Sequence, residues 1–285
     1  MNGFLLIDKN EDWSSRDVCN KIQHVLSCKK VGHTGTLDPF ATGLLLVSIG
    51  NGTKAGTFLE EFDKEYEATL VFGKKTSTSD KNGDVLKEEN VPELNKEMVE
   101  STLKSLVGKQ KQIPPMTSAI HYKGQKLYKL AHQGIEVERE PRDIEIFSLE
   151  LLEFNAMSIK FRCHVSKGTY VRVLGETIAE KLNTVGYLST LRRIAVGPYR
   201  IESAIKLEDV EESKIFSIRE ILEKHMYTWT VFKNNQKRIT DGAPMRIENI
   251  NQSYDKILIV DEEGNALAVY KRSEGDTFIC ARGLW

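Results

Sequence analysis

A 15-residue segment near the amino end, KKVGHTGTLDPFATG (residues 29–43), constrains the fold more than any other part of the chain. It contains three glycines, three threonines and a proline, which favour turns and irregular backbone. The apolar residues 44–49 follow at once, and a short apolar run of this kind is typical of a buried strand. We therefore expect a long loop that leads the chain into the core.

Regular elements are expected on both sides of this loop. Residues 66–72 alternate apolar and polar side chains, as half-buried strands do. In residues 96–106 apolar side chains recur at helical spacing, with Met98 and Leu103 on the side expected to face the core. The same criteria predict strands at 4–8, 44–49, two within 144–165, and 187–196, and helices after the N-cap Ser14 and at 170–182. One of these strands, 159–165, has Lys160, Arg162 and His164 on one face, which indicates a charged partner.

The carboxyl end has a different pattern. Residues 205–226 carry six carboxylates against four basic residues, with two short helical patterns. Beyond them, short strand patterns alternate with turns that contain glycine. We therefore expect a first domain at 1–226 and a small all-β domain at 227–285.

The charge balance limits how the chain could bind a polyanion. Its 285 residues include 40 Lys and Arg against 41 Asp and Glu, a net charge of −1, so nucleic-acid binding would depend on local patches. Residues 109–133 form one candidate, with five lysines and two histidines, no carboxylate, and Tyr122 and Tyr128 between them. A solvated surface is the plainer interpretation. Arginines and lysines elsewhere are expected to extend the patch: Arg192, Arg193, Arg200, Lys233, Lys237 and Arg238.

The cysteines and the apolar segments indicate where in the cell the protein is expected. The four cysteines contain no C-x-x-C pair, which fits reduced thiols and neither a zinc knuckle nor a disulfide framework. The longest apolar run, residues 43–50, is too short to span a membrane, and the first residues lack the pattern of a signal peptide. We therefore expect a cytoplasmic protein with no metal site.

Asp38 is the strongest candidate for chemistry. Pro39 restricts the backbone of Asp38 to extended conformations, and three nearby glycines permit sharp turns and close approach of another molecule. An Asp-Pro dipeptide alone more often begins an ordinary turn. The whole segment GHTGTLDPFATGLL (32–45) is far more specific than the dipeptide.

This segment resembles the catalytic-aspartate motif of the TruB-type tRNA pseudouridine synthases of bacteria. Further motifs follow in the same order as in that family: KEYE (64–67), TSTSDKNG (76–83), QIPPMTSA (112–119), GQKLY (124–128), QGIEVER (133–139), SKGTYVR (166–172) and LRRIAV (191–196). The resemblance covers about residues 4–196. One departure is the opening motif, KNEDWSS (9–15), where Asn10 and Asp12 replace the usual proline and glycine.

The resemblance implies an α+β fold, with a mixed, largely antiparallel sheet, flanking helices and a small carboxyl-terminal PUA-like domain that binds RNA. It also implies that the chain isomerises uridine 55 in the T arm of tRNA to pseudouridine after the base flips out of the RNA. That reaction has no net redox change and needs no cofactor. A monomer that binds the tRNA T arm, with no membrane and no small-molecule cofactor, is expected.

The resemblance also assigns the site residues. Asp38 would be the nucleophile, either attacking C1′ or promoting a glycal route through the 2′ position. Arg172 would pair with this carboxylate and keep it ionised. Tyr66 would stack on the flipped base and take part in proton transfer. The remaining substrate-binding residues would be His33, Tyr170, Leu191 and Lys9, while Asp80 would have a structural or RNA-positioning role.

Two other functions compete with this interpretation. The chain could be a tRNA-binding or tRNA-folding protein that has lost catalysis, but Asp38, Tyr66 and Arg172 are all present. It could also be a carbohydrate hydrolase with Asp38 and a second carboxylate, although no partner acid stands out.

Overall fold

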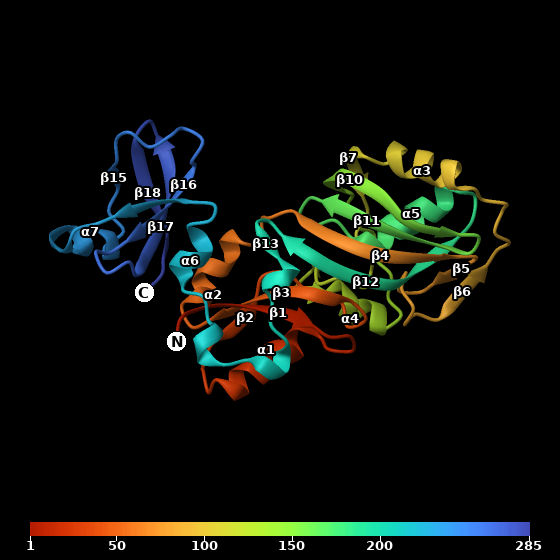
Figure 1. The fold of residues 1–285 in the computed structure, drawn as a ribbon, viewed down its shortest axis with the longest axis horizontal. Helices are drawn as coiled ribbons and strands as arrows, with labels where there is room; N and C mark the ends of the chain where they lie inside the picture. Colours follow the sequence, from red (N-terminus) through yellow and green to blue (C-terminus); the bar gives the residue numbers. More distant parts are fainter. The chain divides into compact units, whose positions relative to one another are not determined.

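The computed structural model describes residues 1–131 and 133–285, and Figure 1 shows its ribbon. The chain divides into two compact units. Unit 1 comprises residues 1–38, 43–61 and 198–285, and unit 2 comprises residues 39–42 and 62–197. The boundary expected near residue 226 falls inside unit 1 and stays a prediction.

Unit 2 is organised by an antiparallel sheet with the strand order β12-β4-β11-β10-β7. Its strands are β12 (Gly186–Val196), β4 (Lys64–Phe72), β11 (Ser158–Val165), β10 (Arg142–Asn155) and β7 (Gly108–Gln112). The predicted alternation in β4 is confirmed, because every second residue from Lys64 to Phe72 is buried. One face of the central strand therefore faces the core.

Two helices pack on the sheet of unit 2, α3 (Lys96–Ser105) and α5 (Val171–Lys181) (Figure 1). A Cβ atom at Gly175 would lie 2.9 Å from the Leu188 side chain, so the missing side chain lets α5 approach the strand closely. Both predicted helices are confirmed. Met98, however, is 44% exposed and does not face the core as expected. Val99 and Leu103 form the buried side of α3 instead.

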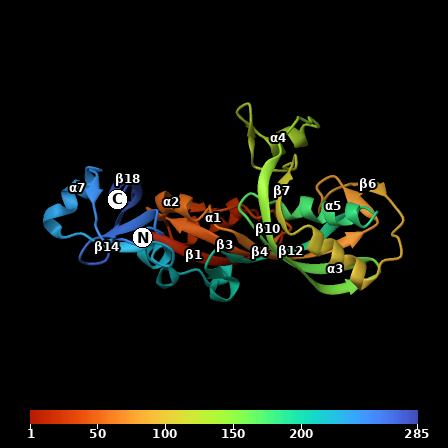
Figure 2. The ribbon, with the colours of Figure 1, turned by 90° about the horizontal axis from the view of Figure 1, so that it is seen from above.

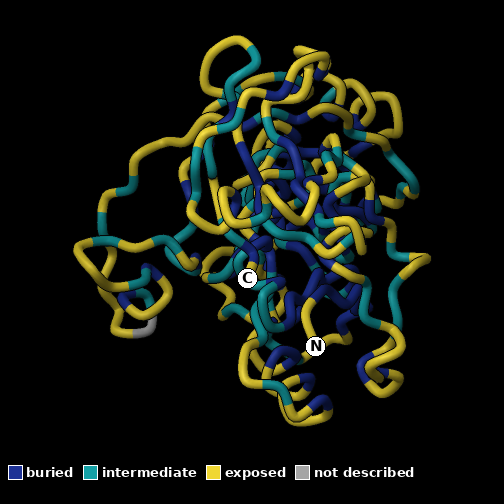
Figure 3. The backbone as a smooth tube through the Cα atoms, turned by 90° about the vertical axis from the view of Figure 1, so that its left-hand side faces the viewer, coloured by how far each residue is buried: buried dark blue, intermediate teal, exposed yellow. Residues whose placement is uncertain are grey.

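A segment of unit 2 stands away from the sheet, and we call residues 113–141 the projecting segment (Figure 2). It contains β8 (His121–Tyr122), β9 (Gln125–Lys126) and α4 (Leu127–His132). Lys123 and Gly124 both have positive φ, 47° and 85°, which fits the tight turn of a two-residue hairpin. Most described residues of this segment are exposed, unlike the strands of the sheet (Figure 3). Unit 2 also has a separate hairpin of β5 (Lys74–Thr76) and β6 (Val85–Glu88).

The first part of unit 1 pairs β1 (Gly3–Lys9) and β2 (Val31–His33) antiparallel with β3 (Thr42–Ile49). The expected loop is therefore partly wrong, since its residues 31–33 gain backbone hydrogen bonds from β3 and form a strand. Helix α1 (Ser15–Val25) begins at the predicted N-cap, where the Ser14 and Asp17 side chains bond reciprocally to backbone N–H groups. Short helical turns follow β3: α2 (Gly52–Ala55) and η1 (Gly56–Phe58).

The carboxyl-terminal part of unit 1 begins with short elements and ends in a five-stranded sheet. The short elements are β13 (Tyr199–Arg200), η2 (Ile201–Ser203), η3 (Leu207–Asp209), η4 (Glu212–Lys214) and α6 (Ile218–Leu222). The sheet has the order β14-β16-β17-β18-β15. Its strands are β14 (Tyr227–Thr230), β16 (Lys256–Val260), β17 (Ala266–Glu274), β18 (Thr277–Gly283) and β15 (Met245–Arg246).

Buried apolar side chains, among them Val231, Tyr270 and Phe278, form the core of this sheet. The expected strands are confirmed, and η5 (Lys233–Asn235) and α7 (Gln236–Thr240) add helical turns to a region expected to be all β. In the described chain, the helices are too short or too polar to cross a membrane.

Candidate active site

The backbone beside Asp38 is anchored to the start of α1. The hydroxyl of Ser15 donates to the carbonyl of Leu37 at 3.1 Å and accepts from the Leu37 N–H at 2.8 Å. Ser15 is buried, and Asp38 itself is half-buried. Gly35 has a φ of 117°, a conformation that side chains rarely allow. Asp38 therefore sits on a fixed backbone, and the positioning role of Ser15 was not predicted.

Lys9 and His33 also lie in unit 1. The ammonium of Lys9 donates to the carbonyls of Asn10 at 2.9 Å and Trp13 at 2.6 Å, and the side chain is 1% exposed. These bonds close the loop of the opening motif, in which Asp12 adopts the left-handed φ of 64° that the family's glycine would favour. His33 is half-buried and pairs with Val47 across β2 and β3. The substrate contacts of Lys9 and His33 stay predictions.

Arg172 is held in unit 2 by a set of contacts that we call the Arg172 cradle: Thr78, Asp80 and Thr117. One terminal nitrogen donates to the Thr78 carbonyl and the Thr117 hydroxyl, each at 2.7 Å. The same nitrogen lies 3.6 Å from the Asp80 carboxylate, and the other terminal nitrogen donates to the Thr117 carbonyl at 3.0 Å. Arg172 is only 4% exposed. Several acceptors thus fix the guanidinium plane, a geometry that a lysine ammonium could not reproduce.

Asp80 is itself fixed by the turn that contains it. Its carboxylate accepts from the Thr78 hydroxyl at 2.7 Å and from the Asn82 N–H at 3.0 Å. The Thr76 hydroxyl donates to the Asp80 carbonyl at 2.7 Å. Gly83 completes the turn, since a Cβ there would lie 2.6 Å from the Thr78 backbone nitrogen. The TSTSDKNG motif therefore forms one side of the Arg172 cradle, which agrees with the structural role expected of Asp80.

Tyr170 begins helix α5, and a side-chain amide fixes its backbone. Gln112 accepts from the Tyr170 N–H at 2.8 Å and donates to its carbonyl at 3.1 Å. Gln112 opens the QIPPMTSA motif, which also contains Thr117 of the cradle. The motif therefore holds both the start of α5 and the guanidinium that α5 carries. No feature of the sequence alone indicated this role for Gln112.

Tyr66 and Leu191 lie on neighbouring strands of unit 2. Tyr66 is opposite Arg193, and Leu191 is opposite Ala68, two residues along β4. Side chains opposite each other in an antiparallel pair share one face, so Tyr66 and Leu191 share the buried face of the sheet. Cys163 is opposite Tyr66 on the other side, and burial raises the pKa of its thiol to about 12. Tyr66 therefore lies between a buried thiol and the buried side chain of Arg193, and it is largely shielded from water.

Arg193 departs from its expected role. It was expected to extend a phosphate-binding surface, but it is 2% exposed. A shift of register between Leu188 and Thr190 interrupts the alternation of β12 before Arg193, so that Leu191 and Arg193 point to the buried face, which a sequence pattern cannot reveal. The lysines of residues 109–133 are largely exposed, as expected of a binding patch.

Carboxylates of unit 2 pair with the basic side chains on the charged face of β11. Arg162 lies 2.7 Å from Glu67, and Lys160 lies 3.6 Å from both Glu67 and Glu153. Asp63 contacts the His164 ring. The hydrogen bond from Arg162, together with the neighbouring positive charges, lowers the pKa of Glu67 despite partial burial. The charged partner predicted for this face is therefore the protein itself.

Comparisons with known proteins agree on a family. Residues 23–171 match the model described as "TruB family pseudouridylate synthase (N terminal domain)". Over 237 residues the chain is 43% identical to "tRNA pseudouridine synthase B" of Francisella tularensis subsp. tularensis (strain WY96-3418), covering 80% of this chain and 78% of the relative. A protein of the same name from Francisella philomiragia subsp. philomiragia is 42% identical over the same share of each chain.

Solved structures share the fold. "Crystal Structure of a Cbf5-Nop10-Gar1 Complex" contains a chain with a TM-score of 0.75 and 22% identity, covering 99% of this chain and 85% of that chain. "Structure of H/ACA RNP bound to a substrate RNA containing 2'-deoxyuridine" contains another, with a TM-score of 0.74 and 20% identity over the same shares. The expected α+β fold is confirmed.

The fold and the sequence matches together define the class of this protein, a pseudouridylate synthase. Within that class, the chain belongs to the TruB family.

Proposed function

We propose that the protein converts uridine 55 in the T arm of tRNA to pseudouridine, with Asp38 as the nucleophile. The observation that carries the proposal is the 43% identity to a protein named tRNA pseudouridine synthase B, over 80% of this chain. The family match at residues 23–171 includes Asp38 and Tyr66. The buried, fixed guanidinium of Arg172 lies directly beyond that range and suits a site that handles a carboxylate.

The reaction breaks the N1–C1′ bond of uridine, forms a C5–C1′ bond, and exchanges the C5 hydrogen for a proton on N1. Positive charge develops at C1′ as the glycosidic bond breaks, and a carboxylate can trap that carbon covalently. On the direct route, the detached uracil then turns and attacks C1′ through C5, which releases Asp38. On the glycal route, Asp38 removes the 2′ proton and returns it when C5 bonds to C1′. Substrate and product are isomers, because the proton lost from C5 to solvent is replaced by one taken up at N1.

The other candidate residues support this step. Arg172 keeps Asp38 ionised in a site that the bound RNA closes to water. Tyr66 stacks on the flipped uracil, and Leu191 supplies an apolar wall on the same face of the sheet. Tyr170, His33 and Lys9 contact the substrate around the target base.

RNA binding relies on surface patches, since the net charge is only −1. The exposed lysines of residues 109–133 track phosphates. In the domain expected at 227–285, the exposed Lys233, Lys237 and Arg238 supply further phosphate contacts. The enzyme acts as a monomer. Its four free cysteines fit the reducing cytoplasm, where tRNA is modified.

Release of tritium tests the proposal. A tRNA transcript labelled at uridine C5 loses the label to water only where C5 becomes bonded to the ribose. We expect release from the unmodified transcript and none above background from a matched transcript with cytidine at position 55. Release from both transcripts would show a different target uridine. Binding of both without release would support a non-catalytic tRNA-binding protein.

A further inference from the structure

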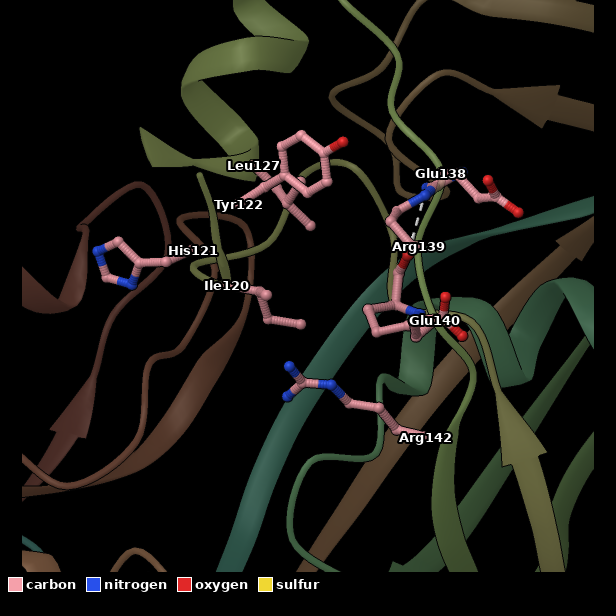
Figure 4. Close-up of a pocket in the computed structure, with 9 residues that line it drawn as sticks. Ile120, His121, Tyr122, Leu127, Glu138, Arg139, Glu140 and Arg142 are labelled. Carbon is pink, nitrogen blue, oxygen red and sulfur yellow. Dashed lines mark hydrogen bonds between the residues drawn. The ribbon is translucent and has the colours of Figure 1, made fainter. Parts of the chain in front are cut away.

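A cavity of about 320 Å³ lies beside the projecting segment of unit 2 (Figure 4). Ile120 and Leu127 form an apolar wall, and the half-buried ring of Tyr122 lies next to Leu127. An aromatic face beside aliphatic side chains is the setting in which proteins hold an unstacked nucleobase. The shape and chemistry of this wall suit a flat ring.

Two arginines line the same cavity and differ in their contacts. Arg139 is used by the fold, because it donates to the Pro114 carbonyl and to the Glu136 carboxylate, each at 3.2 Å. Arg142 extends toward Ile120 (Figure 4). In the parts of the chain that the structure describes, its guanidinium has no hydrogen bond or ion pair. An exposed guanidinium without a partner beside an apolar wall is placed to bind a phosphate.

The charges around the cavity limit the kinds of ligand that it can bind. The hairpin next to the cavity is basic, and the ammonium of Lys123 lies 5.4 Å from the centre of the Tyr122 ring. Glu138 and Glu140 line another side. Their carboxylates would repel a free phosphate but accept hydrogen bonds from the amino group of a base. A nucleotide within an RNA strand, with a base and a singly charged phosphate, satisfies both sides.

One stretch of the chain connects the cavity to the Arg172 cradle. Pro114 and Ile120 line the cavity, and Thr117 between them accepts two hydrogen bonds from Arg172. Ile120 directly follows the QIPPMTSA motif (112–119), whose Thr117 orients the guanidinium. A ligand that packs on Ile120 therefore restrains the backbone that carries Thr117.

We propose that this cavity binds one unstacked nucleotide of the RNA substrate, distinct from the uridine that is converted, with its base on Tyr122 and its phosphate on Arg142. Its occupation restrains the backbone around Thr117 and so holds Arg172 in place for the reaction. This inference rests on the proposed function, because it takes RNA as the ligand.

Crosslinking tests where the RNA lies. An unmodified tRNA transcript is irradiated with short-wave ultraviolet light together with the full-length protein, so that any base can crosslink, and the crosslinked peptides and nucleotides are identified by mass spectrometry. We expect a crosslink in the peptide that contains Tyr122, to a nucleotide other than the target uridine. A peptide crosslinked only through the target uridine, or no crosslink in this region, would overturn the inference.

Kinetics test the pocket independently. Tyr122→Ala and Arg142→Gln should each raise KM for tRNA about five- to tenfold and lower kcat severalfold, because Arg172 is less well held. Tyr122→Phe should recover most of the loss, since the ring remains. Arg142→Gln should also reduce the slope of log affinity against log salt by about one.

Lys104→Gln on α3 is the matched control, because it removes one exposed positive charge and Lys104 does not line the cavity. Its kinetic constants should equal those of the wild type. If the cavity variants behave like this control while the wild type forms pseudouridine, the cavity inference fails and the proposed function stands. If the wild type forms none in tRNA, the proposed function itself fails.

Discussion

Two of the arginine–carboxylate pairs in unit 2 differ mainly in their access to water. Arg172 and Asp80 lie 3.6 Å apart, with side chains 4% and 7% exposed. Arg162 and Glu67 lie closer, at 2.7 Å, but their side chains are 44% and 23% exposed. Water screens the exposed pair, which is expected to add at most about 1 kcal/mol to stability. Burial, and not the shorter distance, therefore indicates which pair the protein depends on.

The largest difference between the pairs is expected in catalysis. Arg172→Lys should lower the rate of pseudouridine formation by roughly 10²-fold, because an ammonium cannot bind Thr78, Thr117 and Asp80 in the same plane. The dissociation constant for tRNA should change little. Single-turnover rates and filter binding with the same transcript measure the two effects.

Arg162→Lys is the control for this variant, since it makes the same substitution in the exposed pair. Its rate should stay within about twofold of the wild type. Equal rates for Arg172→Lys and Arg162→Lys would contradict the claim that catalysis depends on the buried pair, and would show that the Arg172 cradle has no positioning role.

A smaller difference is expected in stability. Asp80→Asn keeps an oxygen for the bonds from Thr78 and Asn82 but removes the charge next to Arg172. Loss of one partner of a buried pair costs about 3 kcal/mol of the free energy of unfolding. Glu67→Gln should cost less than about 1 kcal/mol. Urea unfolding of both variants measures the difference, and equal losses would contradict the dependence on burial.

The titration of a half-buried histidine in unit 1 extends the comparison. Burial, and to a smaller extent the charge of Lys256, lowers the pKa of His225 from 6.5 to about 4. The unfolded chain therefore binds the proton first, so this contribution to stability is complete above pH 6.5 and is lost as the pH falls toward 4.

Between pH 7 and pH 5, the melting temperature of the wild type should therefore fall by roughly 2–4 °C more than that of His225→Gln. Thermal unfolding at both pH values measures this, with each protein compared to itself. The same fall in both proteins would show that His225 is not shielded from solvent.

The regular elements were largely predictable from local patterns. The alternation of residues 66–72 and the N-cap Ser14 predicted β4 and α1, because both signals depend on neighbouring residues alone. The motifs pointed to Asp38, Tyr66 and Arg172 through resemblance. Their roles stay predictions.

The contacts that hold the site were not predictable in the same way. Arg172 binds Thr78 and Thr117, which are 94 and 55 residues away in the chain, and no local pattern encodes such pairings. Arg193 was assigned to the surface because arginine usually is exposed, and the irregular register of β12 changes which face it occupies. The apparent partner surface on β11 was neutralised by glutamates of other strands.

The rate of Asp38→Asn most directly tests whether one carboxylate performs the chemistry. With enzyme in excess over a tRNA transcript, the wild type should form pseudouridine at position 55, mapped by mass spectrometry of the digested RNA. Asp38→Asn should bind the transcript with a similar dissociation constant and form at least about 10³-fold less product in the same time. Equal product from the two proteins would contradict the central claim.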